Sequence, residues 1–200
     1  VSTPSIPETW IEQLKTGGLM LTVLQETPGD GWDLLVRLKK GKTGMSGGVV
    51  DLVGFMTLTG RLSTSRSSRD EVVDLYPGKK ARKVHAPWSD FSGGALLRVQ
   101  RDFHFFAQLE GFLLEPTRSG EHIVSHPDLD GHMISRRDGL DRYGSTALSD
   151  RFDKMFTKWA DYGSPTRRDY AIRILGRNQK GRGQGWIMER EDARFWFSLR

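Results

Sequence analysis

The densest group of residues that could carry chemistry lies between positions 122 and 132. Three of the five histidines and two aspartates fall there, and imidazole together with carboxylate suits zinc, manganese or iron. The spacing matches no named metal motif, and Pro127 and Gly131 break regular structure between the histidines. We therefore expect a solvated polar loop without metal, and a chain that needs no cofactor. The residues of the alternative, a metal site, are His122, His126, Asp128, Asp130 and His132.

A serine motif is the second candidate. The segment GMSGG at positions 44–48 fits G-x-S-x-G, which presents a nucleophilic serine on a sharp turn from a strand into a helix. The residues that follow it, VVDLVGFMTLTG, are strand-like, and no histidine precedes Ser46, as the order of a chymotrypsin-like triad would require. The pattern favours a hairpin or bulge of small residues. A serine or metal-dependent hydrolase that uses Ser46 or the 122–132 segment is the alternative function.

Basic residues gather in two clusters, one in YPGKKARK at positions 76–83 and one at positions 167–182. Such clusters neutralise phosphates on nucleic acid or on anionic lipid headgroups. Tyr170 and Trp186 lie near the second cluster in sequence, where they could stack on bases, and the glycines of its loop GRNQKGRGQG are expected to let the backbone approach a ligand. Without a base-reading motif, contact should be through phosphates. The predicted anion-binding residues are Lys79, Lys80, Arg82, Lys83, Arg167, Arg168, Arg173, Arg177, Lys180 and Arg182.

Three consecutive aromatic residues, Phe195, Trp196 and Phe197, lie near the C-terminal end of the sequence. Successive side chains of a strand point to opposite faces, so this strand must place at least one aromatic ring on each face. One of those faces is predicted to contact a protein partner.

Two helices are predicted to position these groups. The first covers residues 7–15, with proline in its first turn, and the second covers 147–162, with apolar residues at steps of three and four. Ser145 is suited to cap the second helix, and Gly163 with Pro165 to end it. The apolar face of this helix is expected to dock against a sheet. That face is formed by Leu148, Phe152, Phe156 and Trp159.

The remaining periodic segments indicate strands. Residues 19–25 and 32–39 form a plausible hairpin, 49–62 one bent strand or two short ones, and 95–115 the strongest strand region. Two further strands, starting at residues 170 and 186, flank the basic loop. Residues 117–144 are predicted to be a long surface loop. The predicted fold is α+β and mainly antiparallel β, as a single domain over residues 1–200, with the short N-terminal helix and one amphipathic helix packed on the sheet.

Length and composition bound the class of protein. The 200 residues, 36% of them hydrophobic, suffice for one sizeable core. The net charge of +5 carries meaning only where it clusters. Cysteine is absent, which excludes disulfides, thiolate zinc sites and cysteine nucleophiles. No apolar run reaches the roughly 20 residues of a membrane helix, and no signal peptide is recognisable, so we expect a soluble or peripheral protein, intracellular rather than secreted.

Together these features predict a non-enzymatic structural or assembly protein. Its basic loops would bind a polyanionic partner, either a nucleic acid such as RNA or an anionic membrane surface, and it would associate with itself. Viral coat and matrix proteins combine these properties, which is an analogy of physical type. A protein-interaction adaptor, in which the basic loops only add solubility, is the other alternative.

Overall fold

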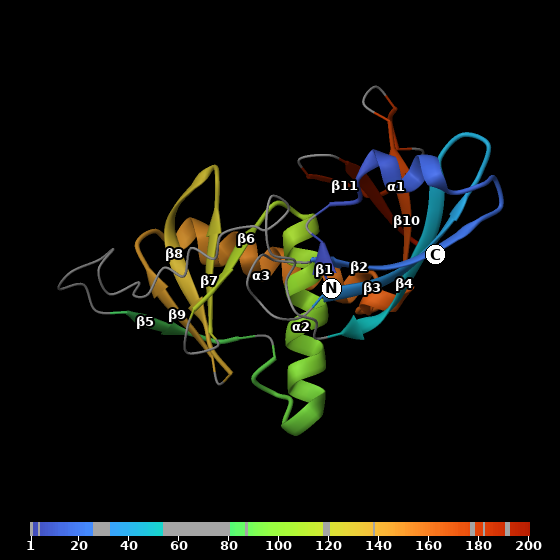
Figure 1. Cartoon of the computed structure of the whole chain (residues 1–200). Coiled ribbons are helices and arrows are strands. Elements are labelled where there is room, and N and C mark those ends of the chain that lie inside the picture. Colours follow the sequence, from blue (N-terminus) through green and yellow to red (C-terminus); the bar gives the residue numbers. More distant parts are fainter. Residues whose placement is uncertain are drawn as a thin grey trace. The chain divides into compact units, whose positions relative to one another are not determined.

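The computed structural model (Figure 1) describes residues 2–3, 5–25, 33–53, 81–86, 88–117, 121–137, 139–176, 179–181, 183–190 and 193–200. The chain divides into two compact units. Unit 1 comprises Val1–Arg66 and Pro165–Arg200, and unit 2 comprises Ser67–Ser164. Helices combine with antiparallel sheets, so the α+β class is confirmed. The prediction of a single domain is not confirmed.

Unit 1 is built on a seven-stranded sheet with the order β1-β2-β3-β4-β10-β12-β11. The predicted hairpin is confirmed, because β2 and β3 pair antiparallel from Leu19 opposite Lys39 to Gln25 opposite Asp33. The strands on either side of the basic loop both form, but β12 lies between them in the sheet. The elements of unit 1 are β1 (Ser2–Thr3), α1 (Glu8–Gln13), β2 (Leu19–Gln25), β3 (Asp33–Lys40), β4 (Met45–Val53), the 3-10 helix η2 (Arg167–Asp169), β10 (Tyr170–Leu175), β11 (Trp186–Glu189) and β12 (Arg194–Leu199).

Buried and exposed side chains alternate along these strands, so the sheet has a core face and an exposed face. On β10 and β12, Ile172 pairs with Phe197 and Ile174 with Phe195, and all four side chains are buried. Trp196 points to the opposite face, which we call the outer face. Phe195 and Phe197 therefore belong to the protein's own core.

Unit 2 contains a five-stranded antiparallel sheet with the order β5-β9-β8-β7-β6. Three of its strands lie in residues 117–144, so the prediction of a long loop there was wrong. The buried pair Ile123 and Ile134 joins β7 to β8, and Tyr143 of β9 packs against it. The strands are short, and the charged residues around them obscured this apolar pattern in the sequence. The elements of unit 2 are β5 (Arg82–Val84), α2 (Gly93–Leu109), β6 (Leu113–Pro116), β7 (His122–His126), β8 (Leu129–Ser135), β9 (Leu140–Tyr143) and α3 (Thr146–Asp161).

Helix α2 corrects a second prediction, the strand at 95–115. Leu96, Gln100, Phe103 and Ala107 are buried and recur at steps of four, three and four, which places them on one face of a helix. The sequence reading gave more weight to the period of two between Phe103 and Phe105. Both of these rings are fully buried because α2 is covered on more than one side. The α2 helix contacts α3 and β6.

Helix α3 is the predicted amphipathic helix, and the predicted cap is present. The Ser145 hydroxyl accepts a hydrogen bond of 3.1 Å from the backbone amide of Ala147. Helix α3 contacts β8 and α2, and Phe152 is fully buried while Phe156 is half-buried. None of the helices in the described ranges is long and apolar enough to span a bilayer.

Candidate anion-binding groove

One row of directly paired residues crosses six strands on the outer face of the unit 1 sheet. Residues opposite each other on neighbouring antiparallel strands project to the same side. Leu19 and Ile187, at the two ends of the row, are 63% and 44% exposed. In strand order from β2 to β11 the row consists of Leu19, Lys39, Ser46, Arg173, Trp196 and Ile187.

A second row lies two residues further along the strands. Leu21, which is 65% exposed, pairs with Arg37, and Arg37 pairs with Gly48. The guanidinium group of Arg200 lies over Gly48, because a Cβ built on that glycine would stand 1.6 Å from the Nη2 atom of Arg200. The outer face therefore has apolar residues at its margins and cations at its centre. We call this centre the basic strip, and it consists of Arg37, Lys39, Arg173 and Arg200.

A groove opens where β4 begins and β10 ends. Its volume is about 590 Å³. Arg173 and Lys180 contribute cations to its wall, Thr43 and Ser46 contribute hydroxyl groups, and none of the described residues that line it carries a carboxylate. Neither cation forms an ion pair with any residue that the structure describes. The groove is therefore a local concentration of positive charge with hydrogen-bond donors around it.

Two sets of contacts fix the cations of the groove. The guanidinium carbon of Arg173 lies 5.9 Å from the centre of the Trp196 ring, within the range of a cation–π interaction. Before Lys180, the Gln179 amide donates a hydrogen bond of 3.0 Å to the Gly176 carbonyl, and the Gly176 amide donates one of 3.1 Å to the Gln179 side chain. Arg194 also donates to the Gln179 carbonyl, at 3.3 Å. The ring contact restricts the Arg173 side chain, and the contacts of Gln179 hold the backbone next to Lys180.

The glycines of the basic loop were expected to let the backbone approach a ligand, but Gly181 and Gly185 lie against residues of the protein itself. A Cβ on Gly181 would stand 2.2 Å from the indole Nε1 atom of Trp196. A Cβ on Gly185 would stand 2.3 Å from the carbonyl oxygen of Phe197 and 2.7 Å from the same Nε1 atom. Gly181 and Gly185 thus pack on the outer side of Trp196, where a larger residue would overlap the indole ring.

The predicted anion-binding residues are divided between the two units. Arg82 and Lys83 are exposed on β5 in unit 2, whereas the described residues of the second cluster lie in unit 1. Arg167 is buried and Arg168 forms an ion pair of 2.6 Å with Asp51. The groove brings together Arg173 and Lys180. The others, Lys79, Lys80, Arg177 and Arg182, lie outside the described residues.

The Asp51 carboxylate is specifically stabilised in its charged form. A hydrogen bond from the Leu52 backbone amide, and after it the hydrogen bond from Arg168, lower the pKa of Asp51 below its ordinary value, although burial opposes the shift. Arg168 is thus engaged in an internal ion pair. This leaves the Arg173–Lys180 pair as the better candidate for an external anion.

A larger groove, about 930 Å³ in volume, runs along α1 beside the same strand ends. The described cations on its wall have internal partners. Lys40 donates hydrogen bonds of 2.8 Å to the carbonyl oxygens of Ile11 and Leu14, and Arg194 forms an ion pair of 3.0 Å with Glu189. Lys40 thus satisfies carbonyl groups at the C-terminal end of α1, which would otherwise lack donors.

Ser46 lies within β4, where its neighbours are Lys39 on β3 and Arg173 on β10. It is therefore part of a continuous sheet and does not occupy the strand-to-helix turn of a nucleophile elbow. The small residues around it have a packing reason. A Cβ on Gly47 would stand 1.8 Å from the carbonyl oxygen of Arg37.

The histidine and aspartate candidates are distributed over β7, β8 and the turn between them. His126 is buried against Phe112, and its Nδ1 atom accepts a hydrogen bond of 3.1 Å from the Asp128 amide. His122 packs its ring against His104 instead, with 4.9 Å between the ring centres. Among the described residues, no group of three or more potential ligands is placed to hold a metal ion.

A polar network in unit 2 was not anticipated from the sequence. The Nε2 atoms of Gln100 and His104, one helical turn apart on α2, lie 3.2 and 3.0 Å from the Ser135 hydroxyl. All three side chains are buried. The spacing of Gln100 and His104 would have suggested a shared partner if residues 93–109 had been recognised as a helix.

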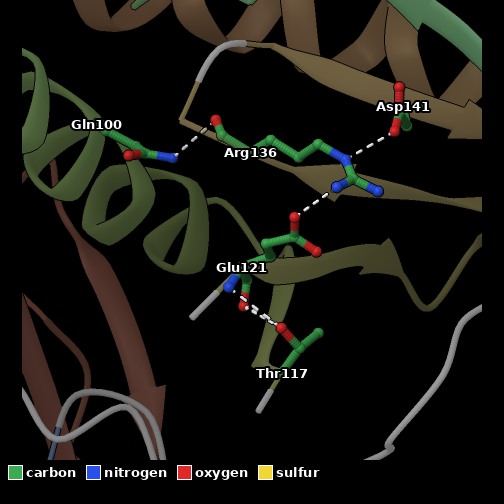
Figure 2. Close-up of polar contacts among 5 residues, drawn as sticks. All are labelled: Gln100, Thr117, Glu121, Arg136 and Asp141. Atoms are coloured by element: carbon green, nitrogen blue, oxygen red, sulfur yellow. Dashed lines mark hydrogen bonds and ion pairs between the residues drawn. The ribbon is translucent and has the colours of Figure 1, made fainter. Parts of the chain in front are cut away.

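Figure 2 shows how this network continues through Arg136. The backbone carbonyl of Arg136 accepts a hydrogen bond from Gln100, and its guanidinium group bonds to Glu121 at 2.5 Å and to Asp141 at 2.7 Å. Burial lowers the pKa of Arg136, but the hydrogen bond to Asp141 and the charges of Glu121 and Asp141 outweigh it, and the pKa is raised. Glu121 is held in turn by two hydrogen bonds to the Thr117 hydroxyl. The network ties α2, β9 and the β6–β7 turn together, which is a structural role.

Comparison with known proteins gives little that bears on this site. No protein-family model matches the chain, and no curated protein matches it. Among solved structures, the chain is similar to one titled protein-L-isoaspartate O-methyltransferase, with a TM-score of 0.43 and 20% sequence identity. The match covers 90% of this chain and 50% of that one, so the chain spans half the length of that protein. This level of similarity transfers neither that fold nor that activity to the present chain.

The function predicted from the sequence, a non-enzymatic structural protein of viral coat or matrix type, is not retained, because no comparison supports it. No comparison supports a viral, RNA-binding or other nucleic-acid-binding role. The prediction was wrong because clustered charge and scattered aromatic rings are shared by many classes of protein.

Proposed function

We propose that unit 1 binds a ligand through a carboxylate or phosphate group, held in the groove between Arg173 and Lys180. The observation that carries the proposal is the juxtaposition of these two cations with the Ser46 and Thr43 hydroxyls, in a groove whose described lining residues include no acid. Charge-assisted hydrogen bonds to such groups are about twice as strong as those between neutral groups. The remaining cations of the basic strip add attraction at longer range.

The geometry favours recognition of an anionic group over attraction by net charge alone. Arg173 can present two parallel N–H donors to a carboxylate or phosphate, while Lys180 supplies a compact charge. Because the Trp196 ring already restricts the Arg173 side chain, this residue loses less side-chain entropy on binding. A weak site for one or two anionic groups is the expected result.

The test is a titration of the full chain with inorganic phosphate and, separately, with citrate. The side-chain N–H signal of Trp196 is followed by nuclear magnetic resonance and assigned with a Trp196→Phe variant. Arg173→Gln and Lys180→Gln should each weaken binding by about tenfold or more, the value expected for loss of a hydrogen bond to a charged group. The two titrations also distinguish a phosphate ligand from a carboxylate ligand.

The matched control is Arg151→Gln, which removes one positive charge from an exposed position on α3 in the other unit. This variant should bind both anions as the original chain does. Equal weakening by Arg151→Gln and Arg173→Gln would show that only net charge matters and would refute the proposed site. Unchanged signals at millimolar anion would refute it as well.

A further inference from the structure

The outer face holds more than the groove, and its apolar margins also require an explanation. Leu19 and Leu21 are 63% and 65% exposed on β2, and Ile187 is 44% exposed on β11. Single exposed apolar residues are common, but these leucines project to the same face of one sheet and share rows with cations. A small anion in the groove would leave them uncovered.

We propose that the occupant of this face is an extended acidic polypeptide segment with an apolar residue on each side of its acidic centre. The inference rests on the proposed anion-binding function, since the acidic centre would occupy the Arg173–Lys180 groove and the basic strip. The apolar residues of the segment would contact Leu19 and Leu21 at one margin and Ile187 at the other.

The dimensions of the row suit such a segment. Strands lie about 4.8 Å apart, so a row across six strands is about 24 Å long. An extended chain advances about 3.3 Å per residue, so about seven residues cover that length. Lys39 and Arg173 are separated by one strand, or roughly 10 Å. Side chains two residues apart in an extended segment share a face and lie about 6.6 Å apart, so two glutamates at that spacing can reach both cations through their flexible side chains.

Charge and shape distinguish this occupant from others. A second copy of this chain would bring a net charge of +5 and a matching basic strip, and like charges placed face to face are repulsive. A nucleic acid offers regularly spaced phosphates without aliphatic side chains for the margins. Entry into a bilayer requires apolar groups to sink roughly 5–10 Å below the headgroups. The leucines project from the same face of the sheet as Arg37 and Lys39, directly opposite them, so these two cations would have to sink with them.

The experiment uses fluorescein-labelled peptides of about seven residues and measures anisotropy with the full chain. The first peptide has glutamates at its centre and a leucine at each end. The second replaces both leucines by glycine, and the third replaces the glutamates by glutamine. We expect the first peptide to bind about tenfold more tightly than either of the others. The double variant Leu19→Gln/Leu21→Gln should clearly reduce the difference between the first two peptides, because only the leucine at the Ile187 margin then keeps its contact.

The matched control is Leu113→Gln, which changes a leucine that is 49% exposed on a strand of unit 2. It should leave the order of the three peptides unchanged. Equal binding of the first and second peptides, both weakened by Arg173→Gln, would overturn the acidic-segment inference while the anion-binding function stands. A lack of binding by all peptides and by citrate and phosphate would overturn both.

Two further arms address the excluded macromolecules. A single-stranded RNA of matched charge, or vesicles containing phosphatidylserine, should compete at least tenfold more weakly than the first peptide at the same ionic strength. If either competes as well as the peptide, the inferred occupant is wrong. Binding measured at two salt concentrations separates the charged contribution to affinity from the apolar one, because salt screens the contacts of the glutamates and does not screen those of the leucines.

Discussion

Replacement of Gly47 by alanine tests whether the small residues around Ser46 serve the packing of the sheet. Gly47 lies in β4, between Leu38 on β3 and Ile172 on β10. A Cβ at this position would stand 1.8 Å from the carbonyl oxygen of Arg37 and 2.9 Å from the Cα atom of Leu38. Both are backbone atoms, so no change of rotamer relieves the overlap. Strands β3 and β4 would have to separate by more than one ångström.

The loss in free energy of unfolding can be estimated from the packing and the hydrogen bonds that the separation of β3 and β4 would disrupt. Overpacking in a well-packed interior costs about 1–3 kcal/mol, and each buried backbone group that loses its partner costs about 1–3 kcal/mol more. With one such group affected, Gly47→Ala should lower the free energy of unfolding by roughly 2–6 kcal/mol. At a few degrees per kcal/mol, the corresponding decrease in Tm is on the order of 5–20 °C.

The assay is urea denaturation followed by both tryptophan fluorescence and circular dichroism. Gly176→Ala is the control within the same unit, because a Cβ there would meet the Gln179 side chain at an ordinary 3.6 Å. Its stability should stay within about 0.5 kcal/mol of the original chain. If Gly47→Ala costs less than 1 kcal/mol, or no more than Gly176→Ala, then the packing explanation of this glycine is incorrect.

Two further predictions concern the aromatic core of unit 2 and the acid response of unit 1. Phe152→Ala should cost about 3–5 kcal/mol because its ring is fully buried, while the half-buried Phe156 should cost clearly less; equal losses in the free energy of unfolding would contradict the packing of α3. The lowered pKa of Asp51 means that the hydrogen bonds its carboxylate accepts from the Leu52 amide and from Arg168 stabilise the fold above the ordinary pKa of 3.8, and this stabilisation is lost as the pH falls through the folded-state pKa. Asp51→Asn should therefore reduce the pH dependence of unfolding only below about pH 4, and a changed slope between pH 5 and 8 would argue against this assignment.

Local sequence signals were sufficient to predict the elements that have capping or stop residues at their ends, or whose apolar residues recur with a clear period. The hydroxyl of Ser145, the glycine at 163 and the apolar steps of α3 act within a few residues of one another, so the helix can be read without the rest of the chain. The same holds for the hairpin of β2 and β3. The α+β class follows from such elements.

Helix α2 and the sheet of unit 2 required the tertiary structure. The segment at 93–109 contains apolar residues that fit both a period of two and a period of 3.6, and packing against α3 and β6 decides between them. Strands β7, β8 and β9 are only four to seven residues long. Strands of that length are specified mainly by partners across the sheet, such as Ile134 opposite Ile123, and not by their own sequence.

The candidate site also depends partly on local sequence and partly on the tertiary structure. The sequence alone identified Arg173 and Lys180 as members of a basic cluster, and the alternation in β3 could have indicated that Arg37 and Lys39 share a face. Which cations would meet, and beside which apolar residues, depended on the strand order. Residues far apart in the chain, such as Lys39 and Arg173, share one row because β4 lies between their strands, and no local interaction encodes that arrangement.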